Sequence, residues 1–198
     1  MNSRVYWNRK WAIEGAMTWR RYPECFKRIC EKIGKGKKVI DFGGGVGILA
    51  NELKQSGNEP YIVDISDMAI DIAWKVYEIP GEAMKVPPIT LSVEQRFDYV
   101  VATEFLEHII ELHDFLDQAA GLADKAIYAV PNNVLGPNEE PEHVRKFTEE
   151  SLKEILVRYY STVQTETFKD AFYYMYYDPR VGPKVMNVPT LIAYCEVA

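Results

Sequence analysis

Residues 39–50 read VIDFGGGVGILA, in which four glycines separate two apolar runs. The first run predicts a short buried strand, and the second begins a helix, ILANELKQSG, that stops at Gly57. Glycine adopts positive φ without penalty, so this loop can turn tightly and let its backbone approach a ligand closely. One carboxylate, Asp41, stands just ahead of the glycines.

Strands and helices alternate after this stretch. The segment PYIVDIS (60–66) predicts a second strand, and Ser66 is placed to cap the helix that follows it. Further strands are expected at 97–102 and 125–130, and another helix follows Thr148. This alternation predicts an α/β protein with a doubly wound, parallel sheet.

The two ends of the chain complete a single predicted domain, 1–198. Residues 5–33 read as helical, and residues 1–35 are expected to form an N-terminal lid or substrate segment. Within it, Tyr6, Trp7 and Trp11 either cover a cofactor or simply pack as a helix face. Late strands are expected in the tail, where FYYMYY is typical of a two-faced strand rather than an acceptor pocket.

The composition narrows the class of protein. The chain has 198 residues, 47% of them hydrophobic, and no apolar run reaches the roughly 18 residues of a membrane helix. The N-terminus does not resemble a secretory signal. Cys25, Cys30 and Cys195 show no metal-ligand spacing, so reduced thiols in a cytoplasmic protein are expected.

The net charge of −6 is unevenly distributed. Residues 1–38 carry eleven Lys or Arg and three acidic residues, whereas the remainder is strongly acidic. A basic segment can face an anionic substrate or nucleic acid, but it is also typical of a solvated helix face.

The glycine loop fits two classes of cofactor. Gly45-Val-Gly47-Ile-Leu-Ala50 matches the G-x-G-x-x-G/A pattern of dinucleotide binders, and Asp64 follows at the spacing of a ribose-binding acid. Asp41 opposes that reading, because an acid beside the loop repels a pyrophosphate. S-adenosylmethionine carries a sulfonium and an ammonium group instead, which an acid favours. In addition, the chain's Tyr-x-x-x-Lys, Tyr6 to Lys10, precedes the loop, on the wrong side for a short-chain dehydrogenase.

On these motifs the chain resembles the class I S-adenosylmethionine-dependent methyltransferases, in particular the small-molecule subgroup that includes ubiquinone-type O-methyltransferases. VIDFGGGVG is similar to their first motif and YIVDIS to their second, while FDYVVATEFLEHI, AVPN and EHVRKFTEESLKEIL are similar to later segments. The resemblance implies a Rossmann-like, mostly parallel seven-stranded sheet flanked by helices. It also implies in-line methyl transfer to an oxygen or nitrogen nucleophile.

The resemblance assigns cofactor contacts to residues at the expected strand ends. These are Asp41, Gly43, Gly44, Gly45, Gly47, Asp64, Ile65, Glu82 and Thr103. The stretch 77–97 departs from the family pattern because it is short and rich in proline. PGEAMKVP is the candidate for the missing segment, which would make Glu82 the adenine contact.

Glu104, Glu107 and His108 follow the expected third strand at i, i+3 and i+4, a spacing that shares one face of a helix. His108 is the candidate acid–base residue, and Glu104 would border the methyl site. With His143, these side chains could instead bind a divalent metal, as in some ubiquinone-type relatives and in RNA 3′-terminal 2′-O-methyltransferases. A structural pair that orients the helix is favoured over a metal site.

The expected partner is a small-molecule methyl acceptor, with no membrane association and with a monomer or homodimer as the assembly. Three alternatives stay open: a nucleic-acid methyltransferase that uses the basic segment, an NAD(P)-dependent oxidoreductase, and a binding protein without turnover. A nucleic-acid binder should lose affinity steeply with salt, which a small-molecule enzyme should not.

Overall fold

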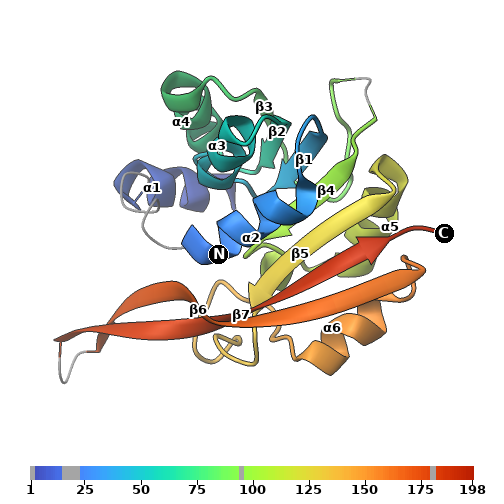
Figure 1. The fold of residues 1–198 in the computed structure, drawn as a ribbon. Helices are drawn as coiled ribbons and strands as arrows, with labels where there is room; N and C mark the ends of the chain where they lie inside the picture. The colour runs from blue at the N-terminus through green and yellow to red at the C-terminus, as the bar shows by residue number, and fades with distance from the viewer. Residues whose placement is uncertain (1–2, 15–22, 94–95, 179–181) are drawn as a thin grey trace.

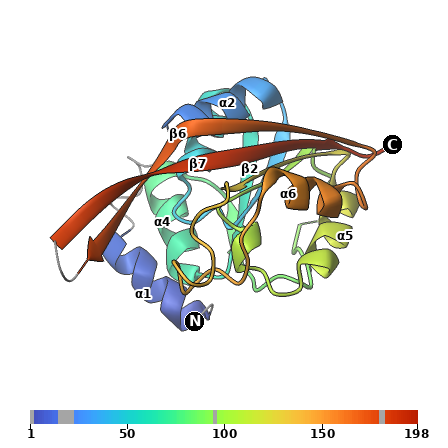
Figure 2. The ribbon, with the colours of Figure 1, turned by 90° about the horizontal axis from the view of Figure 1, so that it is seen from below.

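The structure is a computed structural model that describes residues 3–14, 23–93, 96–178 and 182–198. Helices cover both faces of one sheet (Figures 1 and 2). The strands are β1 (Lys38–Phe42), β2 (Glu59–Asp64), β3 (Gly81–Ala83), β4 (Tyr99–Thr103), β5 (Lys125–Pro131), β6 (Thr162–Asp178) and β7 (Gly182–Glu196). The helices are α1 (Arg4–Glu14), α2 (Pro23–Ile33), α3 (Ile48–Gln55), α4 (Asp67–Tyr77), α5 (Leu112–Leu122) and α6 (Glu149–Leu156), with a 3₁₀ turn, η2, at Leu106–His108.

The sheet has seven strands in the order β3-β2-β1-β4-β5-β7-β6. The first five run parallel, and β7 is antiparallel to both β5 and β6, so the predicted mostly parallel, seven-stranded sheet is confirmed. Asp41 of β1 is in register with Ile62 of β2 and Val101 of β4. The strand order reverses beside β1, and in such sheets ligands bind beyond the carboxyl ends of the strands at that point.

The core lies on both faces of the sheet because successive strand residues point to opposite sides. Ile40 and Phe42 pack on one face with α5 and α6, where Phe115 and Leu152 are fully buried. Val39 packs on the other face with α2 and α3. Asp41 is two residues after Val39 in the strand, so its carboxylate lies on the same α2–α3 side, near the carboxyl end of β1.

Two helix starts are as expected from the sequence. The Ser66 hydroxyl accepts a hydrogen bond from the Ala69 amide (3.1 Å) at the start of α4. Thr148 and Ser151 form a reciprocal capping box at the start of α6. Both caps satisfy amide groups that a helix leaves without an internal partner.

The prediction that residues 5–33 are helical is confirmed at both ends. Helices α1 and α2 cover these ends, and the part of the prediction over residues 15–22 lies outside the described residues. Pro23 begins α2, as suits a residue without an amide hydrogen at the first helical position. Within the described residues, no helix is both long and apolar enough to cross a membrane.

The late strands form a long hairpin. β5 pairs with β7 only from Thr190 onward, so the outer part of β6 and β7 extends past the rest of the sheet (Figure 1). FYYMYY belongs to β6, which confirms the predicted strand. Its side chains lie outside the part of the chain whose side chains are described.

Removal of the Thr148 side chain tests whether the capping box stabilises the start of α6. Thr148→Ala should lower the free energy of unfolding by about 1 kcal/mol, because the Ser151 amide loses its side-chain acceptor. Urea denaturation measures the change, with Thr90→Ala in an exposed loop as the control, expected to stay within about 0.5 kcal/mol of wild type. Equal stability of the two variants would contradict the assignment.

Candidate active site

A cavity of about 150 Å³ lies beyond the carboxyl ends of the parallel strands. Its wall comes from α1, the glycine loop, the end of β2 and the segments that follow β3 and β4. Five of the predicted site residues line it: Gly43, Asp64, Ile65, Glu104 and His108. The fold therefore brings together residues that are far apart in the sequence.

The glycine loop is tied to the end of β2 by hydrogen bonds. The Gly43 amide donates to the Val63 carbonyl (2.7 Å), and the Gly45 amide donates to Asp64 Oδ2 (3.0 Å). The other oxygen of Asp64 accepts from the Ser66 amide (2.9 Å). Gly43 and Gly45 have φ of 72° and 54°, a region that disfavours other residues. Burial raises the pKa of Asp64 to about 6, against the lowering effect of these amides.

Asp41 lies behind the glycine loop and is not among the residues that line the cavity. It is fully buried, and a Cβ added to Gly44 would lie 2.8 Å from its Oδ2. Neither carboxylate oxygen has a hydrogen-bond partner within the described residues. Burial, with a further contribution from the charge of Asp64, raises the pKa of Asp41 to about 8.

The other predicted cofactor contacts occupy different positions. Glu82 in β3 accepts hydrogen bonds from the Tyr61 hydroxyl (3.3 Å) and the Ser92 amide (3.1 Å), and it does not line the cavity. Thr103 is half-buried at the end of β4 and is also absent from the cavity wall, as are Gly44, Gly45 and Gly47. The wall after β3 is formed instead by Met84, Lys85 and Val86, which sequence reasoning missed.

The predicted helical face over Glu104–His108 was wrong. Glu104 has φ of 50°, and the turn η2 begins only at Leu106. Even so, the two carboxylates interact: burial raises the pKa of Glu104 well above its ordinary value, and the negative charge of Glu107 raises it further. Glu104 Oε1 and both oxygens of Glu107 are buried without a hydrogen-bond partner in the part of the chain that is described. Burial raises the pKa of Glu107 to about 8.

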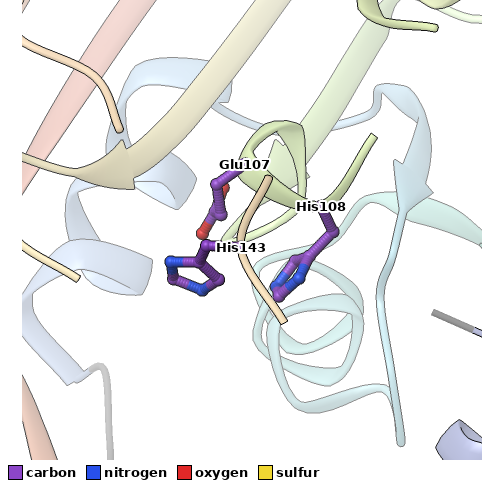
Figure 3. Close-up of side chains that lie close together, drawn as sticks. All are labelled: Glu107, His108 and His143. Carbon is purple, nitrogen blue, oxygen red and sulfur yellow. The ribbon is translucent and has the colours of Figure 1, made fainter. Parts of the chain in front are cut away.

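Glu107, His108 and His143 converge (Figure 3), with one ligand atom from each within 4.8 Å of the others. His108 Nδ1 donates to the Glu142 carbonyl (3.0 Å), and His143 Nδ1 donates to the Leu135 carbonyl. A carbonyl can only accept, so each ring carries its hydrogen on Nδ1 and its lone pair on Nε2. Desolvation, followed by the charge of His143, lowers the pKa of His108 to about 3, which leaves the ring neutral.

Helix α1 covers the crevice. A Cβ added to Gly45 would lie 2.7 Å from the ring of Trp11, so this ring packs directly on the glycine loop. Asn8 Oδ1 accepts from the Ser66 hydroxyl (2.6 Å), and the Trp7 ring stands edge-on to His108 with 5.3 Å between ring centres. The predicted N-terminal segment therefore touches both ends of the site.

A family model for the methyltransferase domain matches residues 16–159 of the chain. The chain belongs to this family. The mitochondrial ubiquinone biosynthesis O-methyltransferase of Schizosaccharomyces pombe is 38% identical over 87 residues, which cover 41% of this chain and 32% of that enzyme. The match thus spans about a third of the curated relative.

Solved methyltransferases share the fold. The complex between the Haloferax volcanii Trm112 methyltransferase activator and a methyltransferase gives a TM-score of 0.76 at 13% identity, covering 100% of this chain and 98% of the matched one. Magnesium protoporphyrin IX methyltransferase from Synechocystis, solved with bound S-adenosylhomocysteine, gives 0.64 at 18% identity and covers 86% and 81%. The methyltransferase domain is therefore Rossmann-like, as predicted.

The buried Asp41 makes the stability of this methyltransferase domain depend on pH. Unfolded Asp41 loses its proton near 3.8, whereas folded Asp41 retains it up to about 8, so the free energy of unfolding falls as the pH rises between these values. Asp41→Asn should flatten this fall, as measured by urea denaturation at about pH 5 and about pH 8. Asp71→Asn, an exposed change on α4, should keep the wild-type slope. A wild-type slope in Asp41→Asn would contradict the prediction.

Proposed function

We propose that the chain binds S-adenosylmethionine in the crevice and methylates an oxygen or nitrogen atom of a small molecule. The observation that carries the proposal is the pair of carboxyl groups, Asp64 and Glu104, that line the cavity and that favour a cationic ligand over a diphosphate. The mitochondrial ubiquinone biosynthesis relative supports an acceptor of small-molecule type.

The chain offers matching groups for each part of this cofactor. The Asp64 carboxylate offers about four lone pairs and accepts from the amides of Gly45, Ser66 and Ile65, so it can still accept from a ribose hydroxyl. The glycine loop leads into α3, whose N-terminal amides face the loop. Trp7, Trp11 and Phe105 are apolar walls that exclude water. S-adenosylmethionine, when bound, supplies a methyl group on a cationic sulfur that is open to in-line displacement.

At the acceptor end, His108 is the candidate proton acceptor. Its Nδ1 donates a hydrogen bond to the Glu142 carbonyl, so Nε2 carries the lone pair that would accept a proton from a hydroxyl or amine. The carboxylate of Glu104 borders the same cavity and would stabilise positive charge there. These two residues keep the roles that the sequence suggested for them.

The alternative functions have weaker support. Several cations of the basic segment are engaged within the fold: Arg4 pairs with Asp67 (3.4 Å) and Arg28 with Glu166 (3.1 Å). A continuous basic face for nucleic acid is therefore not favoured. A nicotinamide dinucleotide would bring a diphosphate to the cavity that Asp64 and Glu104 line, which is unfavourable.

Calorimetric titration tests the cofactor assignment. Wild type should bind S-adenosylmethionine and S-adenosylhomocysteine but not NADH, and Asp64→Asn should weaken binding about tenfold through loss of a charged hydrogen-bond acceptor. Asp71→Asn is the matched control. Binding of NADH alone would overturn the cofactor, and unchanged affinity in Asp64→Asn would overturn the residue assignment.

We further propose that Glu107, His108 and His143 can hold a divalent metal ion. The residues fit such an ion, because both Glu107 oxygens are buried without a partner among the described residues. Both imidazoles are also oriented through Nδ1 by backbone carbonyls, as is typical of metal-ligating histidines. The sequence did not favour a metal at this place. When bound, the ion would take the Nε2 lone pair of His108, so it would replace proton acceptance by that residue and would supply Lewis-acid polarisation of an acceptor oxygen.

Arg145 offers the competing explanation for the buried Glu107. Its positive charge lowers the pKa of Glu107, yet its two terminal nitrogens donate to the carbonyls of Leu106 (3.1 Å) and Ile110 (3.0 Å) rather than to that carboxylate. Arg145 therefore reduces the need for a cation without contacting the Glu107 oxygens.

Metal binding is tested on chelated, untagged protein titrated with Mn²⁺ and with Zn²⁺. Wild type should bind one equivalent, and His143→Gln should bind at least about tenfold more weakly. The matched control is His113→Gln, an exposed histidine whose Nδ1 contacts the Tyr159 hydroxyl and which lies outside the cluster. Equal binding by both variants, or none by wild type, would contradict the site.

A further inference from the structure

Glu142 makes contacts from both its side chain and its main chain that join two parts of the site. One carboxylate oxygen accepts from the Tyr6 hydroxyl, and the other pairs with Lys10 Nζ at 2.6 Å. Its main-chain carbonyl accepts from His108 Nδ1. The residue is buried, at 7% exposure, so its ion pair with Lys10 is sheltered from water and stronger than one on the surface.

The segment around Glu142 is fixed to the turn that carries Glu107 and His108. The Val144 amide donates to the Glu107 carbonyl (2.8 Å), and the Arg145 guanidinium donates to the Leu106 and Ile110 carbonyls. A set of hydrogen bonds therefore joins the segment around Glu142 to η2.

Helix α1 covers the crevice, and two of its side chains, Tyr6 and Lys10, contact the Glu142 carboxylate. Trp7 and Trp11 form part of the wall of a cavity of about 150 Å³, which is small for a nucleoside because ligand pockets usually enclose about 300 Å³ or more. A nucleoside therefore needs more room than this cavity has, and α1 forms part of the wall that encloses it. Lys10 also lies 4.8 Å above the Trp7 ring, so the side chain that pairs with Glu142 also holds the ring that touches His108.

We propose that Glu142 is a positioning residue that latches α1 over the crevice and aligns His108 in the same step. When α1 covers the crevice, Tyr6 and Lys10 contact the Glu142 carboxylate and thereby fix the Glu142 backbone. The Glu142 carbonyl, which accepts from His108 Nδ1, then holds the imidazole in one orientation. Substrate-site closure and assembly of the proton acceptor are then one event. The role of the latch in catalysis rests on the proposed function. The contacts of Glu142 with Tyr6, Lys10 and His108 are independent of that function.

Lys10→Met tests the latch, because it removes the ion pair and keeps an unbranched side chain. Stopped-flow binding of S-adenosylhomocysteine, followed by tryptophan fluorescence, should show association and dissociation rates that both rise, each about tenfold. Two of the four tryptophans, Trp7 and Trp11, lie in α1 and report on its movement. A purely structural role would lower stability without speeding association.

Two further variants control this experiment. Glu142→Gln removes the charge from the other side of the same pair and should reproduce the faster association. Lys153→Met breaks a largely exposed ion pair with Glu149 (2.9 Å) on α6 and should leave both rates at the wild-type value. An association rate in Lys10→Met that equals or falls below that of wild type would overturn the latch.

A second measurement needs no ligand. Nitrogen-15 histidine spectra of wild type should show His108 with its hydrogen fixed on Nδ1, and Lys10→Met should show exchange between tautomers at His108 alone. The chain has only three histidines, so His113→Gln and His143→Gln assign the signals. An unchanged His108 spectrum in Lys10→Met would overturn the coupling between Glu142 and His108. Failure of wild type to bind S-adenosylhomocysteine would overturn the proposed function and would leave this measurement valid.

Discussion

The attachment of the glycine loop to the end of β2 is the contact on which the site depends. Parallel pairing places the ends of β1 and β2 side by side. The Gly43 amide then donates a hydrogen bond to the Val63 carbonyl, and the Gly45 amide donates one to the Asp64 carboxylate. Positive φ at both glycines allows the backbone to reach these acceptors. The loop is thereby fixed before any ligand binds, which lowers the entropic cost of binding.

Burial of negative charge is the second property of this edge of the sheet. Asp41, Asp64, Glu104, Glu107 and Glu142 each have a pKa raised chiefly by desolvation. A folded protein tolerates this arrangement only when the acids are protonated, hydrogen-bonded or matched by cations. Asp64 is bonded by amides and Glu142 by Tyr6 and Lys10. Asp41 and Glu107 lack such partners among the described residues, and burial raises the pKa of each to about 8, so protonation makes their burial tolerable.

The segment between β5 and α6 contacts both the Glu107–His108 turn and helix α1. It supplies His143 to the cluster with Glu107 and His108, and it supplies Glu142 to helix α1. Helix α1 in turn reaches the cofactor side through Asn8 at Ser66 and Trp11 at Gly45. Closure of one helix therefore affects residues that arise from four distant parts of the chain.

The sequence alone determined the sheet, the glycine loop, the helix caps and the family. Their signals are local: glycines after an apolar run, Ser66 and Thr148 before helical segments, and Asp64 at the end of a strand. Local chemistry of this kind is readable because backbone propensity and capping act over a few residues. The glycine and strand-end signals found Gly43 and Asp64, and the family resemblance added Glu104 and His108; all four line the cavity.

Only the tertiary structure decided how those residues are used. It places Asp41 behind Gly44 and Glu82 against Tyr61 and Ser92, and it replaces the expected helix at Glu104 with a strained turn. It also brings Tyr6 and Lys10 to Glu142, more than 130 positions away in the sequence. Such placements depend on how whole elements pack against one another, and no short-range pattern in a sequence encodes a contact made across the sheet.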